Sequence, residues 1–280
     1  MMLTVDKSDQ NLEAKLLGLR DVLSRTANHG RLSIAYSGGL DSRFLAFFAA
    51  RNGFDVELLH ASAAHVSQAE TSDAVRRAQD MGLTVRVVYP QLPSPQQLAQ
   101  AGRDRCYVCK RAIFTALLAE AVAPLCDGSN ASDTLVFRPG SRAIRELGVH
   151  TPLTDAGLTK PQIRTAATKL GLADPQQPAR PCLLTRFDYG DAPDEKRLQL
   201  TQQAEEFLSG LPQLSAGFRV RWLGQRPLLH VSAANALTDK DLSSICEQLT
   251  EKIPELRGVQ AEVMENLSGW FDRKVDDLSR

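Results

Sequence analysis

Hydrophobic positions in the first part of the chain alternate between short apolar runs and longer amphipathic segments. The apolar runs have the length of β-strands and lie at 32–36, 54–61, 83–89 and 123–126. Helical spacing of apolar residues occurs at 8–28, 43–50, 68–81, 105–118 and 159–170. Because strands that alternate with helices through short connections pair in parallel, this pattern predicts an α/β fold. We expect a doubly wound parallel sheet with ligands at the carboxyl ends of its strands.

The pattern changes near residue 191, where a smaller set of elements begins. Charged amphipathic helices are predicted at 194–208 and 237–249, with short strands at 218–222, 227–231 and 259–263. This order predicts a small α+β domain. We therefore expect two domains, 1–190 and 191–280, and a role for the second in substrate binding or oligomerisation. A Pro- and Gln-rich stretch at 90–97 is expected to be a link.

The predicted strand at 218–222 alternates strictly between arginines and large apolar residues. Arg219 and Arg221 should point to one side while Val220 and Trp222 pack inward. Two neighbouring guanidinium groups repel each other unless an anion lies between them, so the pair is a candidate clamp for a phosphate or a carboxylate. A solvated strand face is an equally good interpretation of this stretch alone.

Composition narrows the function classes. The 280 residues include 33 Lys plus Arg and 33 Asp plus Glu, so the protein has no net positive charge that would attract nucleic acid. No apolar stretch is long enough to span a membrane, and the first residues do not look like a signal peptide, so we expect a cytoplasmic protein. Five cysteines in such a chain indicate metal, redox or sulfur chemistry rather than a disulfide framework.

The strongest single motif is the hexapeptide Ser-Gly-Gly-Leu-Asp-Ser at 37–42, between the first predicted strand and a helix. A glycine turn at a helix start presents backbone N–H groups and the positive end of the helix dipole to an anion. Gly38 and Gly39 would let the backbone close around a phosphate, and Ser37 and Ser42 would add hydroxyl donors.

The residues that follow the glycines set the kind of phosphate chemistry. Asp41 could hold the magnesium ion that accompanies ATP, and the unusual Arg43 could add a charge to the phosphate pocket. A Walker A loop would require a lysine here, so γ-phosphoryl transfer is not expected. The end of the second strand, at His60 and Ala61, is where we expect the adenine ring, although the sequence favours a structural role for the histidine itself.

Two stretches place cysteines where they could react or bind metal. Cys106 and Cys109 share one face at the start of a helix flanked by basic residues, an arrangement that suits soft-metal ligation or thiol chemistry. Cys182 lies in a loop interrupted by prolines, four residues before Arg186. This placement is expected of a residue that lines a cleft and not of a core residue. Cys126 and Cys246 lie in apolar patterns and are predicted to be core cysteines.

Taken together, six motifs resemble the LarE family of PP-loop ATP pyrophosphatase sulfur transferases over most of the first 190 residues. In order they read SGGLDS, DRCYVCKR, DGSNASD, FRPG, GLTKPQIR and CLLTRFDYG. The resemblance implies an enzyme that adenylylates a carboxylate of a pyridinium dicarboxylate mononucleotide and replaces the AMP with sulfur, in the synthesis of a nickel-pincer cofactor. It also implies ATP and Mg²⁺ at residues 37–42.

The same resemblance assigns roles to residues outside the loop. Cys182 takes the sulfur-handling position with Arg186 beside it, and substrate-binding positions fall on Arg186, Glu205, Arg219 and Arg221. Some family members sacrifice the cysteine sulfur, whereas others hold a 4Fe-4S cluster by three cysteines. This chain has such a set, Cys106, Cys109 and Cys182, which favours the cluster type.

The expected partners are a small carboxylate substrate, a sulfur donor protein or free sulfide, and further copies of the chain in a homo-oligomer. Three alternatives remain open at this stage. A tRNA thiolase would use the same loop, but the balanced charge argues against it. An ammonia-using PP-loop amide ligase would have no use for three cysteines. A nucleotide-binding sensor would release no pyrophosphate.

Overall fold

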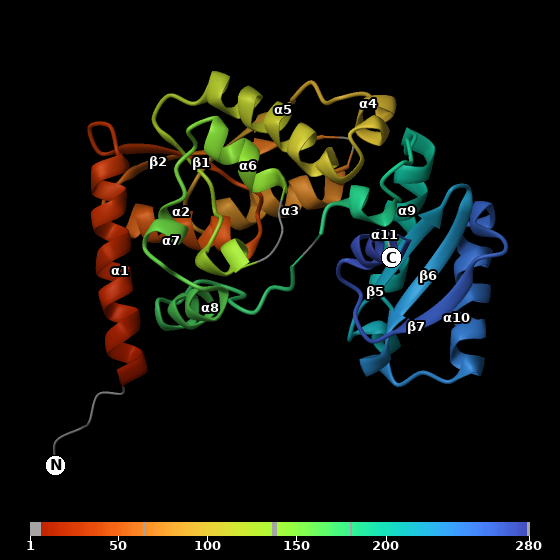
Figure 1. Ribbon diagram of the computed structural model, residues 1–280. Helices are drawn as coiled ribbons and strands as arrows, with labels where there is room; N and C mark the ends of the chain where they lie inside the picture. Colours follow the sequence, from red (N-terminus) through yellow and green to blue (C-terminus); the bar gives the residue numbers. More distant parts are fainter. Residues whose placement is uncertain (1–6, 64, 136–138, 180, 279–280) are drawn as a thin grey trace, which may run out of the picture. The chain divides into compact units, whose positions relative to one another are not determined.

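The sheet that carries the glycine loop is parallel, as the alternation of strands and helices predicts. The computed structural model describes residues 7–63, 65–135, 139–179 and 181–278. Among these residues, four strands form one sheet in the order β3-β2-β1-β4, with β2 parallel to both neighbours and β1 parallel to β4 (Figure 1). The strands are β1 (Arg31–Ala35), β2 (Asp55–Ala61), β3 (Val85–Val88) and β4 (Leu125–Cys126).

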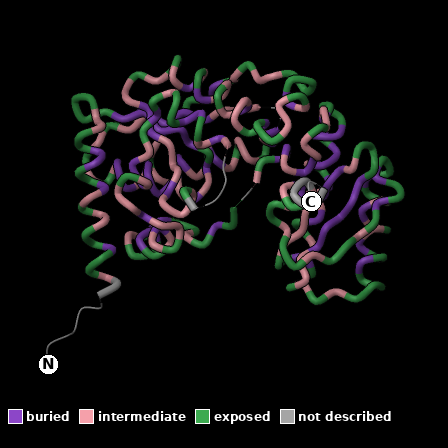
Figure 2. The backbone as a smooth tube through the Cα atoms, in the orientation of Figure 1, coloured by how far each residue is buried: buried purple, intermediate pink, exposed green. Residues whose placement is uncertain are grey.

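Helices cover both faces of this sheet. One apolar cluster packs leucine and phenylalanine side chains of the helices on one face against β1 and β2. A second cluster, on the opposite face of the sheet, includes Leu59, Val88 and Leu125. The first face carries α1 (Lys7–Thr26), α2 (Leu40–Arg51), α3 (Gln68–Gln79), α7 (Pro152–Asp155) and α8 (Lys160–Lys169). The second carries α5 (Arg105–Glu120) and α6 (Pro139–Glu146). Figure 2 shows the strands as largely buried between these layers.

A second, mixed sheet forms the other unit of the chain. In its described residues, three strands pair in the order β5-β6-β7, antiparallel between β5 and β6 and parallel between β6 and β7. The elements are α4 (Pro95–Gln100), α9 (Glu195–Ser209), β5 (Phe218–Leu223), β6 (Arg226–Ser232), α10 (Asp239–Lys252), β7 (Gln260–Met264) and α11 (Trp270–Leu278). Trp222 of β5 is buried and donates from Nε1 to Thr201 Oγ1 of α9 at 2.8 Å, which ties the sheet to that helix.

The chain divides into two compact units, Met1–Pro93 with Arg103–Arg180, and Ser94–Gly102 with Pro181–Arg280. The second unit therefore takes Ser94–Gly102 from the first part of the chain and then continues from Pro181, whereas the expected boundary was 190/191. Phe187 explains the difference, because it is fully buried, bridges to Trp222 of β5 and stacks on its ring at 6.4 Å.

Most of the expected strands and helices are confirmed within a few residues, but several short helices are not foreseen. The link predicted at 90–97 contains the start of α4, where Ser94 and Gln97 form a capping box. Helices α6, α7 and α11 also have no counterpart in the predicted elements. The Phe137-Arg138 half of the FRPG motif lies outside the described residues. Among the described helices, none combines the length and apolarity needed to cross a membrane.

Candidate active site

The glycine loop lies where the sequence places it, between the end of β1 and the first turn of α2. Gly38 adopts φ +73°, a conformation that residues with a side chain rarely adopt. A Cβ on Gly38 would also lie 2.7 Å from Ala74 Cβ of α3. Glycine is therefore required here by both conformation and space, and the loop rests directly on α3.

Two serine hydroxyls hold the loop in shape. Ser42 Oγ donates to Gly39 O at 3.1 Å, accepts from Ser37 N at 3.2 Å and lies 3.1 Å from Ser37 Oγ. The first N–H groups of α2 have no intrahelical acceptor and carry the positive end of the helix dipole. The loop and helix start therefore have the features of an anion site, although the loop itself contains no lysine.

A lysine nevertheless reaches this site from another part of the chain. Lys160 Nζ lies 2.8 Å from both carboxylate oxygens of Asp41. Lys160 is the first residue of α8, which Thr159 and Gln162 cap. The sequence predicts a helix at 159–170 and the motif GLTKPQIR contains this lysine, but neither assigns it to the site. A single lysine directly after a helix cap is a common sequence feature, so the sequence offers no specific reason to place Lys160 in a ligand site.

The loop after β4 covers the start of α2. A Cβ on Gly128 would lie 2.8 Å from Ser42 N, so this backbone passes in direct contact with the helix terminus. Asn130 is buried, and Ala131 N donates to Leu158 O at 2.9 Å. The DGSNASD motif therefore lies against the start of α2 and is joined to the segment that leads to α8.

His60 has a structural role at the end of β2, as the sequence favoured. Its Nδ1 lies 2.9 Å from Tyr36 O and its Nε2 lies 3.2 Å from Thr71 Oγ1. Burial lowers the pKa of this histidine, which favours the neutral ring. Ala61, next along β2, pairs with Val88 of β3. An adenine site at these two residues stays a prediction.

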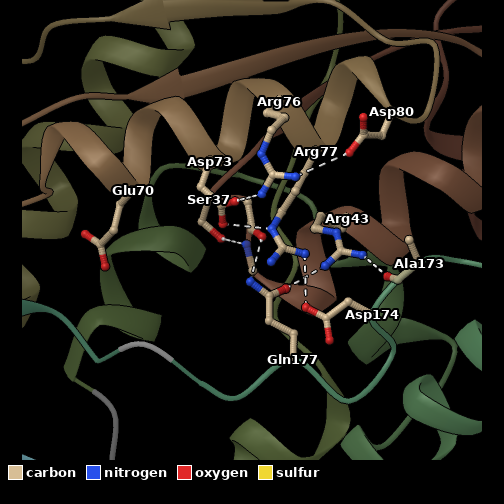
Figure 3. Close-up of polar contacts among 12 residues, drawn as sticks. Ser37, Arg43, Glu70, Asp73, Arg76, Arg77, Asp80, Ala173, Asp174 and Gln177 are labelled. Carbon is tan, nitrogen blue, oxygen red and sulfur yellow. Dashed lines mark hydrogen bonds and ion pairs between the residues drawn. The ribbon is translucent and has the colours of Figure 1, made fainter. Parts of the chain in front are cut away.

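Arg43 does not line the phosphate site as the sequence suggested. Its side chain is buried, and its guanidinium donates to Ala173 O and to Gln177 Oε1 (Figure 3). The expectation was wrong because Arg43 lies on the side of α2 that faces the segment at 173–177, a contact between residues far apart in the sequence.

The cysteines differ strongly in exposure, and none is in a disulfide among the described residues. Cys106 and Cys182 are exposed, whereas Cys109 is buried, with Sγ 3.8 Å from His65 Nε2. Burial lowers the pKa of His65 to about 4, so this ring is neutral at pH 7. Cys126 is fully buried, as predicted, and its burial raises its pKa to about 12. The thiol of Cys246 is half-buried, and burial raises its pKa.

The three candidate metal ligands are divided between the two units. Cys106 and Cys109 lie one turn apart on α5 of the first unit, whereas Cys182 precedes a short 3-10 helix, Leu183–Arg186, in the second. Within the described residues, no three His, Cys, Asp or Glu side chains are gathered as a preformed metal site. The three-cysteine cluster therefore remains a prediction.

The predicted substrate-binding residues of the second unit form one cluster. Arg186 is buried and donates twice to Glu205, from Nε to Oε1 at 2.6 Å and from Nη2 to Oε2 at 2.9 Å. Glu205 also accepts from Val220 N at 3.0 Å. Burial and the neighbouring Arg186 lower the pKa of Arg219, and the same causes lower the pKa of Arg221 to about 9. The cluster thus holds three guanidinium groups against one carboxylate, a positive excess that suits an anion.

Arg221 is not part of a solvated strand face. It is 3% exposed, donates to Leu267 O, contacts His230 Nδ1 and lies 5.4 Å from the centre of the Trp270 ring. The alternative interpretation of this strand is therefore wrong for Arg221. The sequence could not show this, because α11 and its Trp270 cover a face that the strand pattern left open.

Several known proteins resemble this chain, although no protein-family model matches it. The uncharacterized protein slr1717 of Synechocystis is 33% identical over 206 residues, which are 71% of this chain and 75% of that protein. The uncharacterized protein MJ0830 of Methanocaldococcus jannaschii is 26% identical over 247 residues, 87% of this chain and 91% of the relative. The pyridinium-3,5-bisthiocarboxylic acid mononucleotide synthase of Lactiplantibacillus plantarum is 26% identical over 187 residues, 65% and 68% of the two chains.

Proposed function

This chain belongs to the family of Synechocystis slr1717 and is LarE-like, and on that premise we propose that it is an ATP-dependent sulfur transferase. The observation that carries the proposal is the glycine loop at the N-terminus of α2, with Asp41 and Lys160 at its edge. A substrate carboxylate oxygen attacks the α-phosphorus of ATP, and pyrophosphate leaves. The resulting acyl adenylate then loses AMP when sulfur attacks its carbonyl carbon.

The residues of the loop divide this work among them. The N–H groups of the first turn of α2, with the hydroxyls of Ser37 and Ser42, bind the departing pyrophosphate. Asp41 would hold a magnesium ion, which would supply positive charge to the phosphates of ATP. Lys160, whose Nζ lies beside Asp41 at the edge of the loop, would offset the negative charge that develops on the pyrophosphate.

The arginine cluster of the second unit supports an acidic substrate. A pyridinium-3,5-dicarboxylate mononucleotide carries carboxylates and a phosphate, and Arg186, Arg219 and Arg221 present more positive charge than Glu205 can offset. We assign this cluster to substrate binding and Arg186 to orientation of the acceptor. The product would be the thiocarboxylate that leads to a nickel-pincer cofactor.

Sulfur delivery is assigned to Cys182, an exposed thiol in the motif that also holds Arg186. The thiols of Cys106, Cys109 and Cys182 form no disulfide and suit iron as soft ligands, so they would hold a 4Fe-4S cluster. Such a cluster, with one iron left without a cysteine, would supply a site for exchangeable sulfide. Without it, Cys182 itself would lose its sulfur.

Incubation with Mg-ATP and the dicarboxylate mononucleotide tests the proposal. We expect acceptor-dependent release of AMP and pyrophosphate, and a product mass that shows one oxygen replaced by sulfur. Asp41→Asn should lose both signals, whereas Cys182→Ala should still release pyrophosphate but give no sulfur product. Absence of acceptor-dependent pyrophosphate from the wild-type protein would rule the proposal out. The mass of Cys182 after turnover distinguishes a consumed cysteine from a recycled donor.

A further inference from the structure

The carbonyl group of Gly38 in the nucleotide loop is bonded to a side chain from far along the sequence. Gln177 is 4% exposed, and its Nε2 donates to Gly38 O at 3.3 Å. Gly38 is itself buried, whereas Ser37, the residue before it, is exposed. The loop therefore has a buried side, which faces Gln177, and an open side, which an anion can reach.

The peptide group between Gly38 and Gly39 has its two polar bonds on these opposite sides. A trans peptide group is planar, and its C=O and N–H bonds point in opposite directions. Since Gly38 O is bonded to Gln177, the N–H of Gly39 is directed away from that side chain, and it donates to Ser37 Oγ at 3.3 Å. Gly39 is the N-cap of α2, so this N–H lies beside the first N–H groups of the helix.

The two glycines alone do not fix this orientation. Glycine has no Cβ, so the φ values on either side of a peptide flip are both open to Gly39. After such a flip the carbonyl oxygen of Gly38 would face the open side, where its partial negative charge would repel a phosphate. The bond from Gln177 therefore stabilises the orientation that suits an anion.

Arg43 determines which end of the Gln177 amide faces the loop. Its Nη1 donates to Gln177 Oε1 at 2.7 Å, and its Nη2 donates to Ala173 O (Figure 3). A guanidinium group only donates, so the amide oxygen must face Arg43 and the NH₂ group must face Gly38. Arg43 is 2% exposed, so these bonds form where water competes little and polar contacts are strong.

The segment that carries Gln177 is held at further points within the same unit. Gln177 N donates to Asp174 O at 3.2 Å, which closes a turn. Asp174 has φ +49°, a left-handed conformation, and its carboxylate accepts from Arg77 Nη1 of α3 at 3.1 Å (Figure 3). Ala74, about one turn earlier on α3, lies against Gly38. Helix α3 thus braces both the loop and the segment that bonds to it.

We propose that Gln177 is a positioning residue of the nucleotide site and that Arg43 acts through it. The Gln177 amide keeps the Gly38–Gly39 peptide group in the orientation that directs the Gly39 N–H at a phosphate of ATP. This inference rests on the proposed function and adds to it a buried pair outside the phosphate-binding residues. Both side chains and the loop belong to the first unit.

Nucleotide binding to the full-length protein tests the proposal. Calorimetric titration in the presence of Mg²⁺ gives the Kd of two ligands. One is an ATP analogue with a methylene between its α- and β-phosphates, and the other is AMP, which lacks the phosphates that the loop is proposed to bind. Gln177→Met removes both bonds of the amide at similar side-chain length. We expect it to weaken binding of the analogue by about tenfold or more, the scale of one hydrogen bond to a charged group, and to change the Kd of AMP by less than about twofold.

Further variants separate positioning from stability. Gln177→Glu keeps an acceptor for Arg43 but places a second acceptor against the Gly38 carbonyl. In urea it should be at least as stable as Gln177→Met, yet it should bind the analogue no more tightly. Arg43→Met, which leaves the Gln177 amide able to turn, should also weaken binding of the analogue.

The matched controls are Gln176→Met and Gln176→Glu. Gln176 is exposed and precedes Gln177 in the chain. Gln176→Met loses the same kind of side chain, and Gln176→Glu adds the same charge at almost the same place. We expect both controls to bind the analogue and AMP within about twofold of the wild-type protein, because neither alters the bond to Gly38.

The outcomes separate this inference from the proposed function. If the wild-type protein binds no analogue, both are overturned. If it binds the analogue and Gln177→Met binds it equally well, only the positioning role is overturned. The same holds if Gln177→Met weakens binding of the analogue and of AMP by one common factor, as a purely structural role would. Should Gln177→Met fail to fold, Gln177→Glu decides the question by the same comparison, with Gln176→Glu as its control.

Discussion

At the scale of single residues, Lys160 is a side chain of the candidate site that the sequence around it does not predict. The lysine comes from the start of α8 and meets Asp41 of α2 across 119 positions of sequence. Both side chains are about one quarter exposed, so their ion pair contributes little to stability. Lys160 is therefore of interest for its position beside the nucleotide loop and not for the stability that the ion pair contributes.

Replacing this lysine should therefore affect the nucleotide and not the fold. We expect Lys160→Met to change the free energy of unfolding by about 1 kcal/mol or less, since a partly exposed ion pair is lost. Pyrophosphate release at saturating substrate should fall by about 100-fold, the scale of one lost electrostatic contact to a developing charge. Lys15→Met is the control for a lost lysine contact, because Lys15 of α1 donates to Gly157 O and Gln162 Oε1. Unchanged pyrophosphate release in Lys160→Met would remove Lys160 from the site.

His230 makes a second residue-scale prediction, about pH. Burial, and then the nearby Arg221, lower the pKa of His230 to about 4 from the ordinary 6.5. Between these values the unfolded chain takes up a proton that the folded chain does not. Stability is therefore complete above pH 6.5 and falls toward pH 4, by about 1.4 kcal/mol per pH unit.

Urea unfolding followed by tryptophan fluorescence measures this loss, because Trp270 lies 4.7 Å from the His230 ring. Between pH 7 and pH 5, His230→Gln should lose about 2 kcal/mol less stability than the wild-type protein. The same change at the exposed His150 is the control for a surface histidine. Equal losses in His230→Gln and wild type would contradict the low pKa.

At the scale of elements, the contact between the nucleotide loop and α3 depends on a missing side chain. Ala74 of α3 approaches Gly38 so closely that a methyl group there would lie 2.7 Å from Ala74 Cβ. The loop is thus shaped by the helix after β2 as well as by its own glycines. Sequence patterns predicted both elements but not that they touch.

Gly38→Ala should be far more damaging than the same change at a glycine with equal conformation and open space. Gly82 also has φ +73°, and a Cβ there would meet nothing within 4 Å. We expect Gly82→Ala to cost about 1–2 kcal/mol for its left-handed backbone, and Gly38→Ala to cost about 2–4 kcal/mol because overpacking is added. Chemical denaturation of both variants gives the comparison, and equal costs would mean that α3 yields to the methyl group.

At the scale of the whole molecule, each unit has its own sheet and its own buried apolar residues. The sequence has two tryptophans, Trp222 and Trp270, and both belong to the second unit. The glycine loop belongs to the first. Fluorescence therefore reports the second unit, whereas far-UV circular dichroism reports both.

These two probes should give urea transitions that do not coincide. Mg-ATP at 100 times its Kd should stabilise the first unit by about 2.7 kcal/mol, because it binds only the native loop. We expect it to shift the dichroism transition and leave the fluorescence transition in place. Identical shifts in both probes would show that the units unfold as one.

Much of the fold and part of the site were predictable from the sequence because their signals are local. The alternation of apolar runs and amphipathic segments predicted the parallel sheet, and residues 37–42 predicted the glycine turn before α2. Short helices such as α6 and α7 escaped prediction, since so few residues carry no clear periodicity.

The tertiary structure alone decided which distant side chains meet. The Arg43–Gln177 bond spans 134 positions, the Lys160–Asp41 pair spans 119, and Arg221 is buried beneath a helix at the end of the chain. Each contact exists because the carboxyl ends of parallel strands, or the faces of one sheet, bring separate loops to the same place. The sequence therefore gives the chemical character of each residue, but only the folded chain determines which distant residue it contacts.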